Sequence, residues 1–105
     1  MKSKGKVRLG TKTKQLVKEI NPGEIAVINH RDLDQLAAQS LVRAEVKAVI
    51  NAQPSISGKY PNLGPEELLA ANIPVIDDVG EEIFFQLKTG EQITIQEGKI
   101  IQSGE

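Results

Sequence analysis

The chain has 105 residues and no cysteine, and its 13 basic and 14 acidic residues leave a formal net charge of −1. This is the length of one small domain, and the lack of cysteine excludes disulfides, thiolate catalysis and cysteine-ligated zinc. The balanced charge argues against a nucleic-acid partner, which requires a basic face. No apolar run approaches the ~18 residues of a membrane span and no signal-peptide core is present, so we expect a cytoplasmic protein.

Basic residues crowd the first eighteen positions, where seven of the thirteen occur. Such an arm can tether a chain to nucleic acid or to a membrane surface. No aromatic residue interleaves with these charges to stack on bases, so we interpret the arm as a frayed, solvated terminus. We therefore divide the chain into residues 1–21, a basic arm with a helix, and residues 22–105, the folded domain.

In the first half of the chain, the apolar pattern predicts strands that alternate with helices. A short strand is expected at 6–9, followed by a helix that Thr11 caps and that runs through Ile20. A continuous apolar run at 25–28 predicts a strand covered on both faces. Asp32 or Asp34 opens a helix whose apolar positions follow the 3.6-residue period, and a second buried strand is expected at 46–50.

The second half continues with a helix at 65–72, a short strand at 73–76 and a helix at 80–87. Strands at 92–96 and 99–102 form a hairpin around Glu97-Gly98. Strands that alternate with helices imply βαβ units and parallel pairing, and the hairpin adds antiparallel pairs. We expect an α/β fold, a single small domain with a mixed sheet, packed helices and a C-terminal β-hairpin.

The segment 51–65, NAQPSISGKYPNLGP, is the longest without helical or strand periodicity, and it holds three of the five prolines. Loops longer than about 12 residues are uncommon in compact domains and are usually functional or disordered. Gly64-Pro65 followed by two acidic residues is typical of a helix start, where free N–H groups can receive an anion. We predict that this loop binds a small polar ligand or a partner's carboxylate through Asn51, Ser55, Ser57, Lys59, Tyr60, Asn62 and Gly64. The alternative is a structured connector whose polar side chains bond its own backbone.

Polar residues that follow the predicted strands supply possible support for this loop. His30 is the only histidine and lies at the carboxyl end of a strand, where α/β sheets place ligand sites. With Asp32 and Asp34 it could ligate a metal, but no second histidine completes a set, and we predict no metal site. A serine nucleophile would need His30 within reach, and nothing in the sequence brings the two together, so we predict no catalytic residue.

Asp77 and Asp78 end a later strand and are expected near the loop, opposite Lys59. Adjacent residues in an extended segment point in opposite directions, so the two carboxylates would not form an acid–base pair. We expect one of them to cap the helix that begins at Gly80. The candidate supporting residues are therefore His30, Asp32, Asp77 and Asp78.

Several segments resemble the swivelling, mobile domain of enzymes that use phosphoenolpyruvate. The resemblance spans roughly residues 22–102 and is carried by the segments 22–27, 48–50, 72–76 and 87–98. It implies a β/β/α swivelling fold. The phosphorylated histidine of that family would lie near the start of the Pro65 helix, where Asn62, Leu63 and Gly64 stand instead. No nitrogen nucleophile is available there for a phosphocarrier role.

A closer resemblance covers nearly the whole chain and is carried by the segments 23–30, 32–34 and 37–38, by the loop 51–65 and by 73–78. These segments resemble the amino-terminal domain of the SteA family of cytokinetic-ring proteins. Lys59 stands where arginine is common in the family, and Asn29 where many members carry an acidic residue. Longer members continue with a domain similar to thiamin pyrophosphokinase and a hydrophobic carboxyl-terminal segment. We therefore expect this chain to be the amino-terminal part of a longer protein.

The SteA resemblance implies a role in bacterial cell division and in the control of peptidoglycan hydrolysis. We predict a non-catalytic recognition or regulatory domain whose 51–65 loop binds a protein partner, the missing C-terminal domain or a small anion, with a homodimer as a further option. The alternative is part of the active site of a thiamin pyrophosphokinase-like, nucleotide-dependent transferase. Lys59 and the helix start suit phosphate, but no Gly-rich phosphate loop is present. We expect no cofactor in this domain, ATP only in the full-length protein, and membrane contact only through the absent C-terminal segment.

Overall fold

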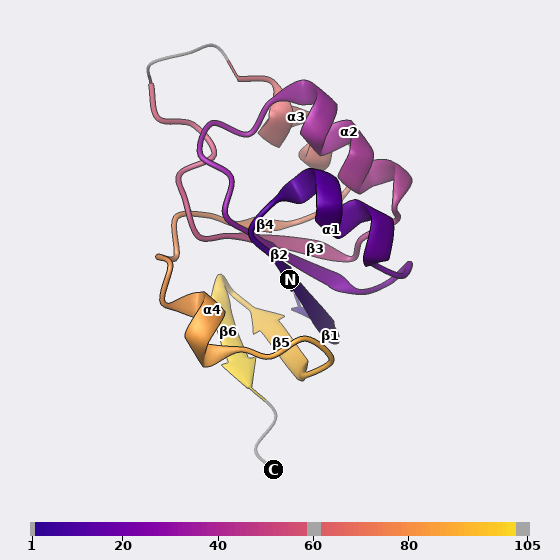
Figure 1. Ribbon diagram of the computed structural model, residues 1–105, viewed down its shortest axis with the longest axis vertical. Helices are drawn as coiled ribbons and strands as arrows, with labels where there is room; N and C mark the ends of the chain where they lie inside the picture. The colour runs from indigo at the N-terminus through magenta and orange to yellow at the C-terminus, as the bar shows by residue number, and fades with distance from the viewer. Residues whose placement is uncertain (1, 59–61, 103–105) are drawn as a thin grey trace.

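The computed structural model describes residues 2–58 and 62–102, which form one curled sheet with four helices (Figure 1). The order of strands in the sheet is β4-β3-β2-β1-β5-β6. The predicted α/β fold with a mixed sheet and a C-terminal hairpin is confirmed. The strands are β1 (Lys2–Gly10), β2 (Ile25–Ile28), β3 (Ala48–Asn51), β4 (Val75–Ile76), β5 (Gln92–Gln96) and β6 (Lys99–Gln102), and the helices are α1 (Thr13–Glu19), α2 (Gln35–Arg43), α3 (Gly64–Ala70) and α4 (Ile83–Gln86).

The sheet has a parallel half and an antiparallel half that meet at β1. Strands β1, β2, β3 and β4 pair in parallel, and each parallel connection carries one of the helices α1, α2 and α3. Strand β5 pairs antiparallel with β1, and β6 pairs antiparallel with β5. The helical connections give the βαβ units that the alternation of strands and helices predicts.

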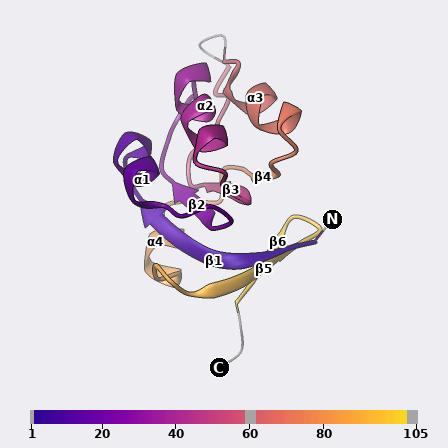
Figure 2. The ribbon, with the colours of Figure 1, turned by 90° about the vertical axis from the view of Figure 1, so that its right-hand side faces the viewer.

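Two apolar cores lie on the two faces of the parallel strands. Helices α1, α2 and α3 cover one face, and the β5–β6 hairpin with α4 lies against the other (Figure 2). Because both faces are covered, strands β2 and β3 are buried at every residue, as their continuous apolar runs predict. Side chains of the helix-side core include Ala26, Ile28, Val49, Leu41 and Leu68, and those of the hairpin-side core include Ile25, Val27, Ile50, Ile93 and Ile95.

Strand β1 lies inside the sheet, so the expectation of a frayed basic arm is wrong. Residues of its first half pair with β5, and residues from Val7 onward pair with β2. Val7 is fully buried and Ser3 is 7% exposed, while the lysines between them face solvent. The first half of this strand was not predicted, because Ser3 and Gly5 take the inward positions and no apolar alternation marks it.

Several expected element boundaries also shift. Thr11 does not cap α1, because Lys12 takes the N-cap position without a side-chain bond. Asp34, one of the two proposed caps, does cap α2 by accepting a hydrogen bond from the Ala37 N–H at 2.7 Å. Helix α4 is shorter than expected and begins without a side-chain cap, so neither of the two aspartates after β4 caps it.

No helix within residues 2–58 and 62–102 is both long enough and apolar enough to cross a lipid bilayer.

The position of β1 predicts how the fold responds to a buried charge. Val7→Asp should lower the free energy of unfolding by about 3 kcal/mol or more, because it leaves an uncompensated charge in the core. The neighbouring Lys6→Asp places a charge on the solvent face and should change the free energy of unfolding by no more than about 0.5 kcal/mol. Urea denaturation followed by circular dichroism measures both values. Equal tolerance of the two changes would show that the amino-terminal segment does not belong to the folded sheet.

Candidate functional site

The segments that follow β2, β3 and β4 meet at one edge of the sheet, because the carboxyl ends of parallel strands lie together. Two backbone hydrogen bonds join the first two of these segments. The Asp32 N–H donates to the Pro54 carbonyl at 3.0 Å, and the Leu33 N–H donates to the Ser55 carbonyl at 2.9 Å. The described part of the 51–65 loop is therefore held against the residues that precede α2.

The carboxylate of Asp32 is the first anchor of the loop. It accepts the Ser57 N–H at 2.8 Å, the Ser57 hydroxyl at 2.9 Å and the Asn62 side-chain amide at 2.8 Å. Ser57 lies in the middle of the loop and Asn62 near its end, so one carboxylate holds these two parts together. Asp32 itself adopts a positive φ of 55°, which aspartate tolerates better than most residues.

The bonds to Asp32 favour its charged form. The Ser57 N–H and hydroxyl, helped by the Asn62 amide and the positive charge of Arg31, hold the pKa of Asp32 below its usual range, against a smaller desolvation effect that raises it. The carboxylate is therefore ionised at neutral pH and remains a strong acceptor.

The carboxylate of Asp77 is the second anchor. Its Oδ1 accepts the Ser55 hydroxyl at 2.7 Å, and its two oxygens accept the Ser55 N–H at 3.0 and 3.1 Å. Asp77 therefore lies at the loop, as the sequence analysis expected. It joins the segment after β4 to the segment after β3. Ser55 is only 2% exposed, so its hydroxyl serves this contact and does not face solvent.

Asn51 joins the same edge from beneath the loop. It is fully buried at the end of β3. Its Oδ1 accepts the N–H groups of His30 and Gln53, and its Nδ2 donates to the His30 carbonyl at 2.9 Å and to the Ser55 hydroxyl at 2.8 Å. The whole hydrogen-bonding capacity of this amide is used inside the fold, which explains how a buried polar group is tolerated.

His30 lies beside this network but directs its ring elsewhere. Its Nδ1 and the hydroxyl of Thr13 on α1 are 2.8 Å apart. The backbone N–H and carbonyl of His30 bond the side chain of Asn51. The Ser55 hydroxyl donates to a carboxylate, so the structure does not arrange His30 and Ser55 as base and nucleophile.

Gly64 begins α3 in a place where no side chain fits. A Cβ atom on Gly64 would lie 2.2 Å from the Leu33 carbonyl oxygen and 2.8 Å from the Asp34 carbonyl oxygen. The glycine therefore lets the helix start approach the segment before α2. The anion site expected at Gly64 stays a prediction.

The structure brings six of the predicted site and supporting residues into two hydrogen-bonded groups that backbone bonds join, and His30 contributes its backbone. Asp78 has no side-chain hydrogen bond among residues 2–58 and 62–102 and adopts a positive φ of 52°. The predicted contacts of Lys59 and Tyr60 lie outside the described residues. Within the described part of the chain, no group of three or more histidine, aspartate and glutamate side chains could hold a metal ion. The first group consists of Asp32, Ser57 and Asn62, and the second of Asn51, Ser55 and Asp77.

Apolar side chains near the loop are the feature that the sequence analysis missed. Ile56 and Leu63 in the loop are 56% and 49% exposed, and Leu69 on α3 is 64% exposed. A pocket of about 230 Å³ opens beside them, between the loop, α3 and β4. The alternation of serine with isoleucine in Ser55-Ile56-Ser57 could have indicated this surface, because both serines turn inward to carboxylates.

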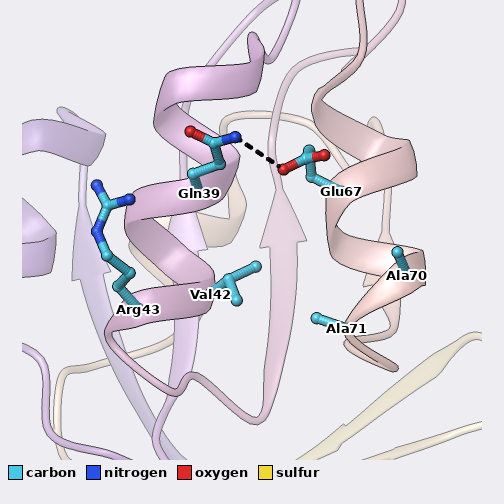
Figure 3. A pocket seen from close by; sticks show the side chains of 6 residues that line it. All are labelled: Gln39, Val42, Arg43, Glu67, Ala70 and Ala71. Atoms are coloured by element: carbon cyan, nitrogen blue, oxygen red, sulfur yellow. Dashed lines mark hydrogen bonds between the residues drawn. The ribbon is translucent and has the colours of Figure 1, made fainter.

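A second hollow lies between α2 and α3 and has a different character (Figure 3). Gln39 donates to Glu67 across it at 3.0 Å, and the rest of the lining includes Val42, Ala70 and Ala71. Arg43 points away from Glu67. Small side chains and one bridging bond make this hollow a seam between two packed helices, and we assign it no binding role.

Comparisons with known proteins support the fold and leave the function open. No known family matches the sequence, and no curated protein matches it either. Among solved structures, the solution structure of a UPF0107 protein is similar, with a TM-score of 0.64, 19% identity, and coverage of 99% of this chain and 92% of the other. A 3-isopropylmalate dehydratase (leuD) chain from Methanocaldococcus jannaschii is similar with a TM-score of 0.55 and 13% identity, over 97% of this chain and 81% of the other. At these identities, the likeness shows a shared α/β fold.

The Asp32 anchor predicts a pH-dependent stability. Because the pKa of Asp32 is lower in the folded state, its carboxylate stabilises the fold above the ordinary aspartate pKa of about 3.9, and this contribution is lost as the pH falls through the folded-state value. Asp32→Asn should therefore be less stable than the unchanged chain at pH 7, and the difference should shrink below about pH 3.9. Denaturant unfolding at several pH values measures this difference.

Asp78→Asn is the matched control, because Asp78 forms no side-chain hydrogen bond among the described residues and asparagine tolerates the same positive φ. Its stability should follow that of the unchanged chain at each pH. A constant difference between Asp32→Asn and the unchanged chain down to pH 2 would contradict the role of the Asp32 charge.

Proposed function

We propose that this chain is the recognition domain of a SteA-like bacterial cell-division protein, and that it binds another protein chain through the surface of the 51–65 loop. The resemblance of the loop NAQPSISGKYPNLGP and its flanking segments to the SteA family supports the cellular role. The arrangement of side chains around the loop supports the mode of action. The partner is a separate protein or the neighbouring domain of a longer chain.

The observation that carries the proposal is that polar side chains of the loop bond the protein, while large apolar side chains near it are exposed to solvent. Ser55, Ser57 and Asn62 bond the carboxylates of Asp32 and Asp77 and hold the loop in one shape. The large apolar side chains nearby remain exposed. Three of the six exposed large hydrophobic residues in the described ranges lie on the loop or on α3, and these are Ile56, Leu63 and Leu69.

An exposed apolar patch on a fixed loop is typical of a protein-binding surface. Apolar groups gain free energy when a partner removes them from water, and polar rims give the contact its specificity. A loop that is already ordered loses less conformational entropy on binding than a mobile one. The hydrogen bonds of Asp32 and Asp77 therefore favour binding indirectly, because they fix the side chains that make the contact.

The other options receive less support from the geometry. The carbonyl oxygens of Leu33 and Asp34 lie against Gly64, so the segment before α2 packs closely on the start of α3. No observation in the described residues favours the transferase alternative, which remains a prediction about the longer protein. ATP would be its cofactor, and Lys59 its candidate phosphate contact.

Site-specific photo-crosslinking in cells tests the proposal. A benzoylphenylalanine at position 56 or 63 should crosslink to a protein of cell division or peptidoglycan hydrolysis, or to the neighbouring domain. The same group at position 36 is the control, because Leu36 is 75% exposed but lines the hollow between α1 and α2, not the pocket beside the loop. Crosslinks only from position 36, or from no position, would contradict the proposal.

Nucleotide titration separates the two classes of function. The isolated chain should show no binding of ATP or thiamin in calorimetry. Binding that disappears in Lys59→Ala would instead favour the transferase alternative.

A further inference from the structure

Strand β4 is one edge of the sheet, and its outer side offers free backbone groups. The Val49 N–H donates to the Pro74 carbonyl, so the backbone groups of Pro74 face β3. In a parallel ladder the next residue faces the opposite way, so the N–H and C=O of Val75 point away from the sheet. Among the described residues, no hydrogen bond occupies them.

Pro74 leaves this outer edge intact. Its missing N–H would have faced β3, not the outside, because its carbonyl faces β3. A proline and a length of two residues are common protections of an edge strand against uncontrolled pairing. The short strand and its proline limit uncontrolled pairing at this edge, but the outward N–H and C=O of Val75 can still pair with one additional strand.

Two pockets flank this edge, one on each face of the sheet. The pocket of about 230 Å³ lies on the helix side and is lined by Ile56, Pro65, Leu69 and Val75 among others. A pocket of about 300 Å³ lies on the hairpin side, between residues 74–76 of the edge and Ser3, Ile95 and Gly98. Figure 2 shows α3 on one side of β4 and the β5–β6 hairpin on the other. Val75 lines both pockets.

We propose that an extended segment of the partner protein adds to the sheet as a seventh strand beside β4, with successive side chains in the two pockets. This inference rests on the proposed function, because Ser55 and Ile56 of the loop line the helix-side pocket. Successive residues of a strand point to opposite faces of a sheet, so one apolar residue enters the helix-side pocket and its neighbour enters the hairpin-side pocket.

The arrangement favours a strand over a helix as the occupant. A bound helix presents a single apolar stripe to a single groove, whereas these pockets lie on opposite faces of one edge. Main-chain hydrogen bonds to Val75 would supply affinity, and the two pockets would supply specificity.

Charge further defines the segment. Asp77 lies on the rim of the helix-side pocket and Glu97 on the rim of the hairpin-side pocket, and no lysine or arginine among residues 2–58 and 62–102 lines either pocket. The matching segment has two consecutive apolar residues flanked by lysine or arginine and lacks acidic residues.

Peptide selection on the purified chain tests the inference. Random linear heptapeptides displayed on phage are selected against the chain, and the tightest binder is synthesised. It should carry the consecutive apolar pair with basic flanks. In ¹⁵N-labelled protein, its addition should shift the Val75 amide resonance and slow hydrogen exchange at that amide. Methylation of the peptide nitrogen that faces Val75 should weaken binding at least about tenfold, the loss expected when one main-chain bond to a partner is removed.

Protein variants give the matched comparison. Leu69→Asp should weaken binding of the same peptide about tenfold or more, because it places a charge at the helix-side pocket. Leu36→Asp, an equally drastic change at an exposed residue on α2, should leave the affinity unchanged. Circular dichroism confirms that both variants fold.

The outcomes separate this inference from the proposed function. If the peptide binds and requires Leu69 but does not protect the Val75 amide, the added strand is wrong, while a partner surface at the loop stands. If no peptide is selected, or if the chain dimerises through β4, the inference is overturned, and crosslinks from positions 56 and 63 decide the proposed function alone. If those crosslinks are also absent, both fail.

Discussion

Two aspartate carboxylates, Asp32 and Asp77, determine the shape of the surface on which this account depends. A long loop leaves many backbone N–H groups and hydroxyls in need of partners, and unpaired buried groups are costly. Here the Asp32 carboxylate, after β2, accepts the N–H and hydroxyl of Ser57. The Asp77 carboxylate, after β4, accepts those of Ser55. Both aspartates follow parallel strands of one sheet, so the sheet, and not the loop, places the two carboxylates.

The buried amide of Asn51 completes this arrangement. It joins the segment after β2 to the segment after β3 and contacts the hydroxyl that Asp77 also binds. The side chains of Asn51, Ser55 and Asp77 form one connected network, and backbone bonds of Asp32 and Leu33 to the loop join it to the Asp32 group. Such networks specify one conformation when they are complete, and the loss of one member exposes the rest. The described part of the loop is therefore as much a part of the folded domain as the strands are.

This network changes the functional interpretation of the loop. The sequence suggests that serines and asparagines face a ligand, and the structure shows that those in its described part face the protein. Among the described residues, the exposed apolar side chains of this region are Leu63 and the pair Ile56 and Leu69, which line a pocket beside β4. A rigid polar support beneath an apolar contact surface suits recognition of a protein chain better than it suits binding of a small polar ligand.

Elements whose pattern is local were predictable, and those that depend on distant partners were not. Strands β2 and β3 and helix α2 carry continuous or periodic apolar runs, so their positions were correct. The first half of β1 pairs with residues 92–96, about ninety positions away, and its lysines and small residues give no signal, so only the second half was predicted, as the strand at 6–9. The partners of Asp32 and Asp77 lie 22 to 30 positions away along the chain, so spacing alone identified the residues but not their contacts.

The backbone dynamics of the free chain test the central claim most directly. Nuclear magnetic relaxation of the ¹⁵N-labelled chain gives an order parameter for each amide, and rigid backbone has values near ~0.85. If the carboxylates of Asp32 and Asp77 hold the loop, the amides of Ser55 and Ser57 should reach the values of strands β2 and β3. Values below about 0.6 at both serines would show a flexible loop and would contradict the account.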